Sequence, residues 1–297
     1  MKSKKLLFRK YTIRETLMAY GFMAPAIILV AIFVLGPIIA SISFAFTDYY
    51  LLKPNEIDYI GLENFKYIVE DDLVLKSFIN TFKFVAMVIP LQVGTALGLA
   101  LLVNKPNKFN SLFKVSFFAP VVMSLVVMSI LWMVILNPES GILNSFLVKI
   151  GLPKQPFLTS ATQAMPTIVV ASAWQGAGYQ MMIFLAGLKN IPANLYEAAS
   201  IDGANKWKQF RFITLPSLRN TSVFVFITTL IGAFKLIVQP MVMTSGGPKN
   251  STLTIVYYIY QTGVRYRNVG YASAIGLIFT IIVTIFILMQ RRLLKEE

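Results

Sequence analysis

Long runs without a charged residue alternate with short charged segments along most of the chain. Five of these runs exceed the roughly 20 residues that a helix needs to cross the hydrocarbon core of a membrane. A sixth apolar run is interrupted only by Lys235. The pattern predicts an all-α integral membrane protein with six transmembrane helices, at about residues 17–46, 80–103, 115–136, 165–188, 218–243 and 270–290.

The apolar segments follow one another without an internal linker, which predicts a single membrane domain over residues 17–290. A short basic segment, residues 1–16, precedes it, and a tail, residues 291–297, follows. The basic start also fits a secretory signal peptide, but the first apolar run is much longer than the ~7–15 residues of a signal core. We therefore interpret the first span as a retained helix.

The positions of the charges predict the orientation of the spans. Assigning both termini and the loops 104–114 and 189–219 to one side places 17 of the 27 basic residues there. The positive-inside rule makes that side the cytoplasm, so both termini are expected inside. The acidic loop 47–76 is then outside, and Arg265 and Arg267 in a later outer loop are the exceptions to the pattern.

Composition narrows the chemistry that is available to the chain. The net charge of +14 is compatible with nucleic-acid binding, but a mean hydropathy of +0.68 and the one-sided basic loops favour membrane topology and contact with anionic lipid. Cys and His are absent, and no Asp or Glu lies inside a predicted span. An intramembrane enzyme or an ion-coupled carrier would have few titratable groups to use.

The loop after the fourth span, residues 190–216, is too patterned for a simple turn. Pro192 suits the first position of a short helix, and Gly203 can supply the positive φ that ends it. Beyond Gly203, aromatic and basic residues alternate up to Pro216, which predicts a second, amphipathic helix. The loop is therefore expected to form an elbow of two short helices on the cytoplasmic face.

The spacing within this elbow resembles the EAA loop of the permease subunits of binding-protein-dependent ABC importers. Glu197-Ala-Ala is followed after three residues by Gly203 and after nine more by Ile213-Thr-Leu-Pro216. Segments elsewhere are similar to the carbohydrate importers of the maltose and glycerol-3-phosphate type, and to the first of their two paired permeases. These segments are Phe22-Met-Ala-Pro25 with Pro37, Gly61-Leu-Glu-Asn-Phe65, Asn80-Thr81, Leu185-Ala-Gly-Leu188 with Ile191-Pro192, Thr244-Ser-Gly-Gly-Pro248, and Gly270-Tyr-Ala-Ser-Ala274.

The resemblance implies a type I ABC importer permease fold in which the elbow couples the chain to a separate ATPase. Small residues allow close approach of another surface, and a carboxylate can pair with an arginine of the partner. The alternative is an amphipathic helix pair that lies parallel to the membrane. The coupling residues expected from the motif are Glu197, Ala198, Ala199, Asp202, Gly203, Ile213, Leu215 and Pro216.

Polar and aromatic residues inside the fourth and fifth spans are the candidates for a substrate pathway. Sugars are bound by aromatic faces together with amide, hydroxyl or charged groups. The alternative is that these polar groups hydrogen-bond helices to one another. The Lys235 side chain either faces a water-filled cavity or extends to the membrane interface by snorkelling. The candidates are Ser172, Trp174, Gln175, Tyr179, Gln180, Thr229, Gly232, Lys235 and Gln239.

The predicted function is the pathway subunit of an ATP-driven importer of sugars or oligosaccharides in a bacterial or archaeal inner membrane. The alternative is an importer of a non-sugar solute such as an amino acid, peptide or phosphate ester. No catalytic residue, metal or cofactor is expected in this chain, which lacks the Gly-x-x-x-x-Gly-Lys-Ser/Thr loop that holds ATP phosphates. The expected partners are a second homologous permease, two ATPase subunits carrying ATP and Mg, an extracytoplasmic substrate-binding protein and membrane lipid, but not nucleic acid.

Overall fold

The structure is a computed structural model that describes residues 13–104 and 107–293. Residues 1–12 of the predicted N-terminal segment and residues 294–297 of the predicted tail lie outside the described part. The α-helices are α1 (Ile13–Val30), α2 (Gly36–Phe44), α3 (Glu63–Glu70), α4 (Asp72–Val103), α5 (Lys108–Val122), α6 (Leu125–Ile135), α7 (Ile142–Lys149), α8 (Ala164–Lys189), α9 (Ala193–Ile201), α10 (Lys206–Gln209), α11 (Leu215–Ser217), α12 (Arg219–Phe234), α13 (Val238–Met243), α14 (Ile255–Tyr260) and α15 (Val269–Leu293). Three five-residue π-helical segments, η1 (Ala31–Leu35), η3 (Phe210–Thr214) and η4 (Gln261–Arg265), and one 3-10 turn, η2 (Phe157–Thr159), join them.

Four stretches of helix in the described chain are long and apolar enough to cross a membrane. They cover Leu17–Phe44, Asp72–Val103, Ala164–Lys189 and Val269–Gln290. These stretches confirm the first, second, fourth and sixth predicted spans. The second starts earlier than predicted because the Asp71 side chain caps α4 by accepting a hydrogen bond from the Leu73 N–H.

The third predicted span, 115–136, is a broken helix. α5 ends at Val122 and α6 begins at Leu125, with a bend of 104° between them. Pro120 lies in the last turn of α5, where it lacks the N–H that would continue the hydrogen-bond ladder. The charge gap could not reveal this break because the residues on both sides of it are equally apolar.

The fifth predicted span, 218–243, is also interrupted. α12 ends at Phe234, Lys235 forms its C-cap, and α13 starts only at Val238. The Leu236 carbonyl in the break accepts a hydrogen bond from the Thr254 hydroxyl, at 2.7 Å, in place of a helical N–H. If each bent helix pair, α5 with α6 and α10–α11 with α12, counts as one crossing, the described chain has up to six.

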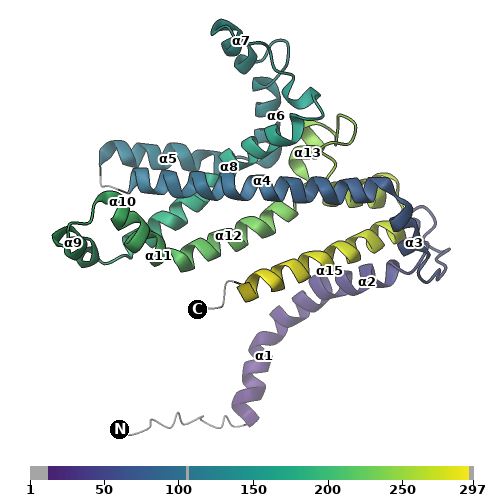
Figure 1. Ribbon diagram of the computed structural model, residues 1–297. Helices are drawn as coiled ribbons and strands as arrows, with labels where there is room; N and C mark the ends of the chain where they lie inside the picture. Colours follow the sequence, from purple (N-terminus) through teal and green to yellow (C-terminus); the bar gives the residue numbers. More distant parts are fainter. Residues whose placement is uncertain (1–12, 105–106, 294–297) are drawn as a thin grey trace.

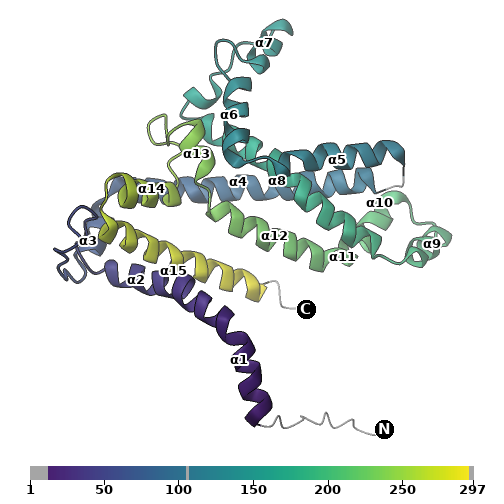
Figure 2. The ribbon, with the colours of Figure 1, turned by 180° about the vertical axis from the view of Figure 1, so that it is seen from behind.

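α4 runs through the centre of the molecule and packs along α8, α12 and α5, while α15 packs on α2 (Figures 1 and 2). α1 diverges from this bundle, and the elbow formed by α9 and α10 lies at the end opposite α3. Buried apolar residues form three clusters that follow the length of α4. Gly178 brings α8 against α5, since a β-carbon there would collide with the Phe117 carbonyl.

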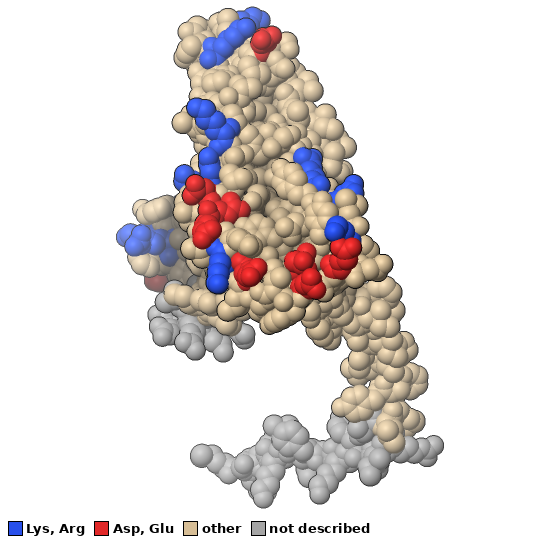
Figure 3. Space-filling model, turned by 90° about the vertical axis from the view of Figure 1, so that its right-hand side faces the viewer, with Lys and Arg blue, Asp and Glu red and all other residues tan. Residues whose placement is uncertain are grey.

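The α3 end of the molecule is closed by hydrogen bonds that join distant segments. The Asn80 amide donates to the carbonyls of Asn250 and Leu253, and the Thr81 hydroxyl accepts from the Ile255 N–H. Acidic and basic side chains gather on the face that this end presents (Figure 3). We call the end that carries α3, α14 and the 244–254 loop the rim.

Candidate functional site

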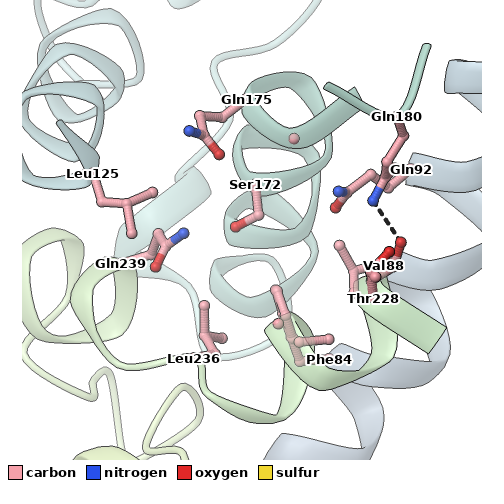
Figure 4. Close-up of a pocket in the computed structure, with 14 residues that line it drawn as sticks. Phe84, Val88, Gln92, Leu125, Ser172, Gln175, Gln180, Thr228, Leu236 and Gln239 are labelled. Atoms are coloured by element: carbon pink, nitrogen blue, oxygen red, sulfur yellow. Dashed lines mark hydrogen bonds between the residues drawn. The ribbon is translucent and has the colours of Figure 1, made fainter. Parts of the chain in front are cut away.

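A pocket of about 220 Å³ lies near the middle of α4 and α8. In Figure 4 the amides of Gln92, Gln175 and Gln239 and the hydroxyl of Ser172 surround a common space. The lining combines polar groups with apolar walls, which is the usual mixture in small-molecule sites. The lining residues are Phe84, Val88, Gln92, Leu125, Ser172, Gln175, Gly176, Gln180, Thr228, Thr229, Gly232, Ala233, Leu236 and Gln239.

Six of the nine pathway candidates from the sequence line this pocket. α8 contributes three polar side chains, α12 contributes a threonine and a glycine, and α13 contributes a glutamine. The six are Ser172, Gln175, Gln180, Thr229, Gly232 and Gln239.

The other three candidates lie outside the pocket lining. Trp174 packs edge-on against Trp132, with ring centroids 5.6 Å apart, and faces a separate apolar groove. Tyr179 shares a helical face with Ser172 by sequence spacing, yet its side chain is 51% exposed. Lys235 is exposed because α12 ends before it, so the predicted row of Thr229, Gly232, Lys235 and Gln239 is not one continuous helix face.

The two helix breaks help to build the pocket. Leu125 begins α6 directly after the first break, and Leu236 and Gln239 lie at the second. Irregular backbone at membrane depth is tolerated where it is buried in protein or lines a cavity. The breaks therefore turn three side chains toward the space between α4, α8 and α12.

Gly176 makes room for Gln92 inside the pocket. A β-carbon at Gly176 would collide with the Gln92 side-chain amide, which reaches across from α4. The sequence analysis missed both residues, together with Thr228. Gln92 did carry a signal, since it is the only amide side chain between Asn80 and Asn104 in the sequence.

The polar groups of the pocket are only partly satisfied by the protein. The Gln180 amide nitrogen donates to the Thr229 hydroxyl, which in turn donates to the Val225 carbonyl. The Ser172 Oγ and the Gln180 Oε1 are both buried and have no hydrogen-bond partner among the described residues. Buried polar atoms without a partner are uncommon in native proteins, and each calls for an explanation such as a bound molecule.

The predicted elbow of two short helices is confirmed. α9 ends at Ile201, and Gly203 follows its C-cap residue; the Gly203 φ of +76° allows the Ala204 N–H to bond the Ala199 carbonyl and its own N–H to bond the Ser200 carbonyl. α10, η3 and α11 then form the second helical arm, which bends by 65° into α12. Pro192 precedes the first arm as its N-cap, one position earlier than predicted, because its ψ of 131° is extended.

Side-chain hydrogen bonds hold the two arms of the elbow together. The hydroxyls of Tyr196 and Thr214 lie 2.9 Å apart, and the Gln209 amide donates to the Ser200 hydroxyl at 2.9 Å. The first arm contacts the second through these few polar groups, so the angle of the elbow is defined within the chain.

The outer surface of the elbow is exposed and partly apolar. Ile201 is 87% exposed and Trp207 is 64% exposed, and Glu197 is also exposed. The predicted coupling residues Ala198, Asp202, Gly203, Leu215 and Pro216 share this exposure, while Ala199 and Ile213 are half-buried. Large apolar side chains on an exposed projection are typical of a protein or membrane contact.

Comparison with known proteins agrees with this arrangement. Residues 73–296 match the family described as "Binding-protein-dependent transport system inner membrane component". The chain is 33% identical to the arabinooligosaccharides transport system permease protein AraP of Bacillus subtilis, over 92% of this chain and 87% of that protein. It is also 33% identical to the lactose transport system permease protein LacF of Rhizobium radiobacter, over 99% of this chain and 98% of that protein.

A solved structure shares the fold. A chain of the bacterial alginate ABC transporter, crystallised with its alginate pentasaccharide-bound periplasmic protein, superposes with a TM-score of 0.83 at 24% identity. The alignment covers 95% of this chain and 97% of that chain. The sequence match, the apolar helices and the fold lead to one conclusion: the chain belongs to the family of multi-pass inner membrane components of binding-protein-dependent transport systems.

Proposed function

We propose that this chain is the pathway-forming subunit of an ATP-driven importer of sugars or oligosaccharides. The observation that carries the proposal is the pocket near the middle of the long apolar helices α4 and α8, lined by amides and hydroxyls, in a chain with relatives named for arabinooligosaccharide and lactose transport. Amides and hydroxyls hydrogen-bond sugar hydroxyls, and apolar walls such as Phe84 and Leu125 suit the carbon framework of a sugar ring.

The six sequence candidates that line the pocket, together with Gln92 and Thr228, are the proposed pathway contacts. At about 220 Å³ the pocket is smaller than the roughly 300 Å³ at the lower end of ligand sites for drug-sized molecules. It therefore holds only part of an oligosaccharide. A second, homologous permease supplies the facing half of the pathway in this proposal.

The elbow is the proposed contact with a separate ATPase subunit, which binds ATP and Mg. Glu197 presents an exposed carboxylate, and the apolar surface around Ile201 gives a partner a desolvated contact. In the proposed mechanism, closure of two ATPase subunits moves the elbow and α12 as one unit. The pocket then opens alternately to the two sides of the membrane.

The proposed orientation places both termini and the elbow in the cytoplasm and the rim outside. The basic loops support it through the positive-inside rule. The rim then faces an extracytoplasmic substrate-binding protein, the kind of partner named in the family description. The alginate transporter of the same fold was crystallised with such a periplasmic protein.

Substitution of Gly203 tests the coupling role of the elbow. Gly203→Asp adds a charged side chain where nothing lies within 4 Å; the positive φ strains any side chain, but Asp tolerates this region better than most residues, so the fold should persist while docking is impaired. We expect sugar uptake to fall at least tenfold, with the amount of inserted protein unchanged. Uptake and ATP hydrolysis would be measured together in membrane vesicles that contain the whole importer.

Gly151→Asp is the matched control for this experiment. Gly151 also has a positive φ, +82°, and open space around its β-carbon position, but it follows α7, far from the elbow in Figure 1. Both variants therefore carry a similar backbone cost. Normal uptake by the Gly203→Asp protein, or an equal loss in both variants, would contradict the coupling assignment.

A further inference from the structure

The pocket is polar and yet carries no charge. Four glutamines, one serine and two threonines form its polar lining, and none of its described lining residues is acidic or basic. Lys235, the cation that the sequence placed in the pathway, is exposed and lies outside the lining. A charged cargo would therefore lose water in this pocket without gaining an opposite charge from this chain.

The hydrogen bonds determine which atom of Gln180 is available to a ligand. The Thr229 hydroxyl has one hydrogen, which it donates to the Val225 carbonyl at 2.6 Å. Its oxygen can then only accept, so the Gln180 group that faces it must be the amide nitrogen. The carbonyl oxygen Oε1 of Gln180 is left as a buried acceptor without a partner in the described part of the chain, and the residue is only 4% exposed.

The hydroxyl of a second threonine in the lining, Thr228, also uses its hydrogen within its own helix. The Thr228 hydroxyl donates to the backbone of its own helix, to the Phe224 carbonyl at 2.9 Å or the Val225 carbonyl at 3.0 Å. Its oxygen therefore presents lone pairs to the pocket. Ser172 is 7% exposed, and its hydroxyl, which has no partner among the residues that the structure describes, can donate or accept. The pocket thus offers acceptors that only a hydrogen-donating ligand can satisfy.

We infer that this pocket selects uncharged polyhydroxyl cargo, whose hydroxyls donate to Gln180 Oε1 and Thr228, and that it rejects sugars bearing carboxylate, sulfonate or phosphate groups. The inference rests on the proposed role of the pocket as the substrate pathway. The shared fold does not determine whether the cargo is charged. One relative is named for the transport of lactose, a neutral sugar, whereas the solved transporter imports alginate, an acidic polysaccharide. At Gln180 Oε1 and the Thr228 oxygen, an anion would place lone pairs against lone pairs, and no described lining residue of this chain offers it an opposite charge.

Uptake from a defined mixture by whole cells tests the charge selectivity. Native cells and cells from which this chain is deleted would receive neutral oligosaccharides from galactoglucomannan and arabinan, mixed with acidic ones from pectin and glucuronoxylan. Mass spectrometry of the medium identifies the sugars whose uptake requires the chain. We expect every such sugar to be neutral.

The possible outcomes distinguish failure of the charge selectivity from failure of the transport function. A carboxylated sugar whose uptake requires the chain would overturn the inference on charge and leave the transport function standing. If the deletion changes the uptake of no sugar at all, the proposed function itself fails.

Substitutions of Gln180 and Ser172 test whether their polar atoms contact the neutral cargo. Gln180→Met keeps the shape of the side chain but removes both the Oε1 acceptor and the amide nitrogen that donates to Thr229, and Ser172→Ala removes only a hydroxyl. We expect each to lower uptake of the neutral sugars by at least about tenfold, the effect of one lost buried hydrogen bond to the cargo. Gln290→Met, a change of the same kind on α15 outside the pocket, should leave uptake normal.

Assembly of each variant is checked by size-exclusion chromatography of the solubilised complex. If Gln180→Met and Ser172→Ala both assemble and transport normally, the pocket is not the pathway, and the inference falls with it. If they assemble and lose uptake of neutral sugars while Gln290→Met does not, the polar lining of Ser172 and Gln180 is supported as the contact with neutral cargo.

Discussion

At the residue scale, two glycines that lie two positions apart on α8, Gly176 and Gly178, have different roles. A β-carbon at Gly176 would meet only the flexible amide of Gln92, whereas one at Gly178 would meet the backbone carbonyl of Phe117 on α5. A side chain can move away at little cost, but a packed helix backbone cannot. Gly176 therefore shapes the pocket, and Gly178 sets the distance between two helices.

Alanine substitution should separate these roles. We expect Gly178→Ala to destabilise the protein by roughly 1–3 kcal/mol, because α5 must shift. Gly176→Ala should remain folded but lower sugar uptake, because Gln92 is displaced from its place in the pocket. Thermal unfolding of the purified protein and uptake in cells measure the two effects.

Gly98→Ala is the control, since nothing lies within 4 Å of a β-carbon at that position on α4. Equal loss of stability in Gly176→Ala and Gly178→Ala would show that the distinction between side-chain and backbone contact is wrong.

At the scale of elements, one carboxylate ties three helices together at the rim. Asp71 Oδ1 accepts from the Leu73 N–H at the start of α4, and Oδ2 accepts from Tyr258 of α14 at 2.6 Å and Tyr271 of α15 at 2.8 Å. Burial, together with the hydrogen bond to Asp71, raises the pKa of Tyr258 above its ordinary value. The phenol therefore stays protonated and keeps donating across the physiological pH range.

Removing this carboxylate should loosen the rim. We expect Asp71→Ala to cost roughly 2–4 kcal/mol, because α4 loses its cap and two tyrosine hydroxyls lose their acceptor. Asp71→Asn should cost less, since its remaining oxygen can still cap α4. Thermal unfolding measures both, with the exposed neighbour Asp72→Ala as control. Equal losses in Asp71→Ala and Asp72→Ala would contradict the role of the cluster.

The helix breaks show where prediction from the sequence was incomplete. The elbow could be predicted because Gly203 and the alternation of aromatic and basic residues are local signals. α5 ends at Val122, two residues after Pro120, and α12 ends at Phe234, directly before Lys235, but the apolar composition continues beyond both ends, so charge spacing predicted continuous spans. What stabilises such a break is a distant partner, as when Thr254 bonds the Leu236 carbonyl.

On the scale of the whole molecule, much of the apolar surface is not covered by the chain itself. No residue is buried in the most apolar window of the first span, and only 17% are buried in that of the last. Such surface suits lipid or another membrane subunit, whereas 61% of the α8 window is buried in the protein. α8 is therefore the inner helix of this chain, which agrees with its position beside the pocket.

The proposed orientation can be tested by labelling, because the sequence contains no native cysteine. Lys53→Cys at the rim should react with a membrane-impermeant maleimide in intact cells. Asn194→Cys in α9 should react only after the membrane is permeabilised. Both wild-type side chains are exposed, so access across the membrane is the variable. The reverse pattern would place the elbow outside and contradict the proposed coupling.

Charge spacing and helix periodicity were sufficient to establish the membrane class, the approximate spans and the elbow, because the cost of burying charge and the geometry of a helix act locally along the chain. Six of the residues that line the pocket were predicted from the sequence, but their assembly into one pocket with Gln92 and Thr228 was not. Its groups come from Gln92, Gln180 and Gln239, which are far apart in sequence and meet only through packing. Packing also placed Lys235 outside the lining, since the helix ends one residue before it. Which side of an apolar helix faces a cavity depends on its neighbours, and the segment alone does not encode that choice.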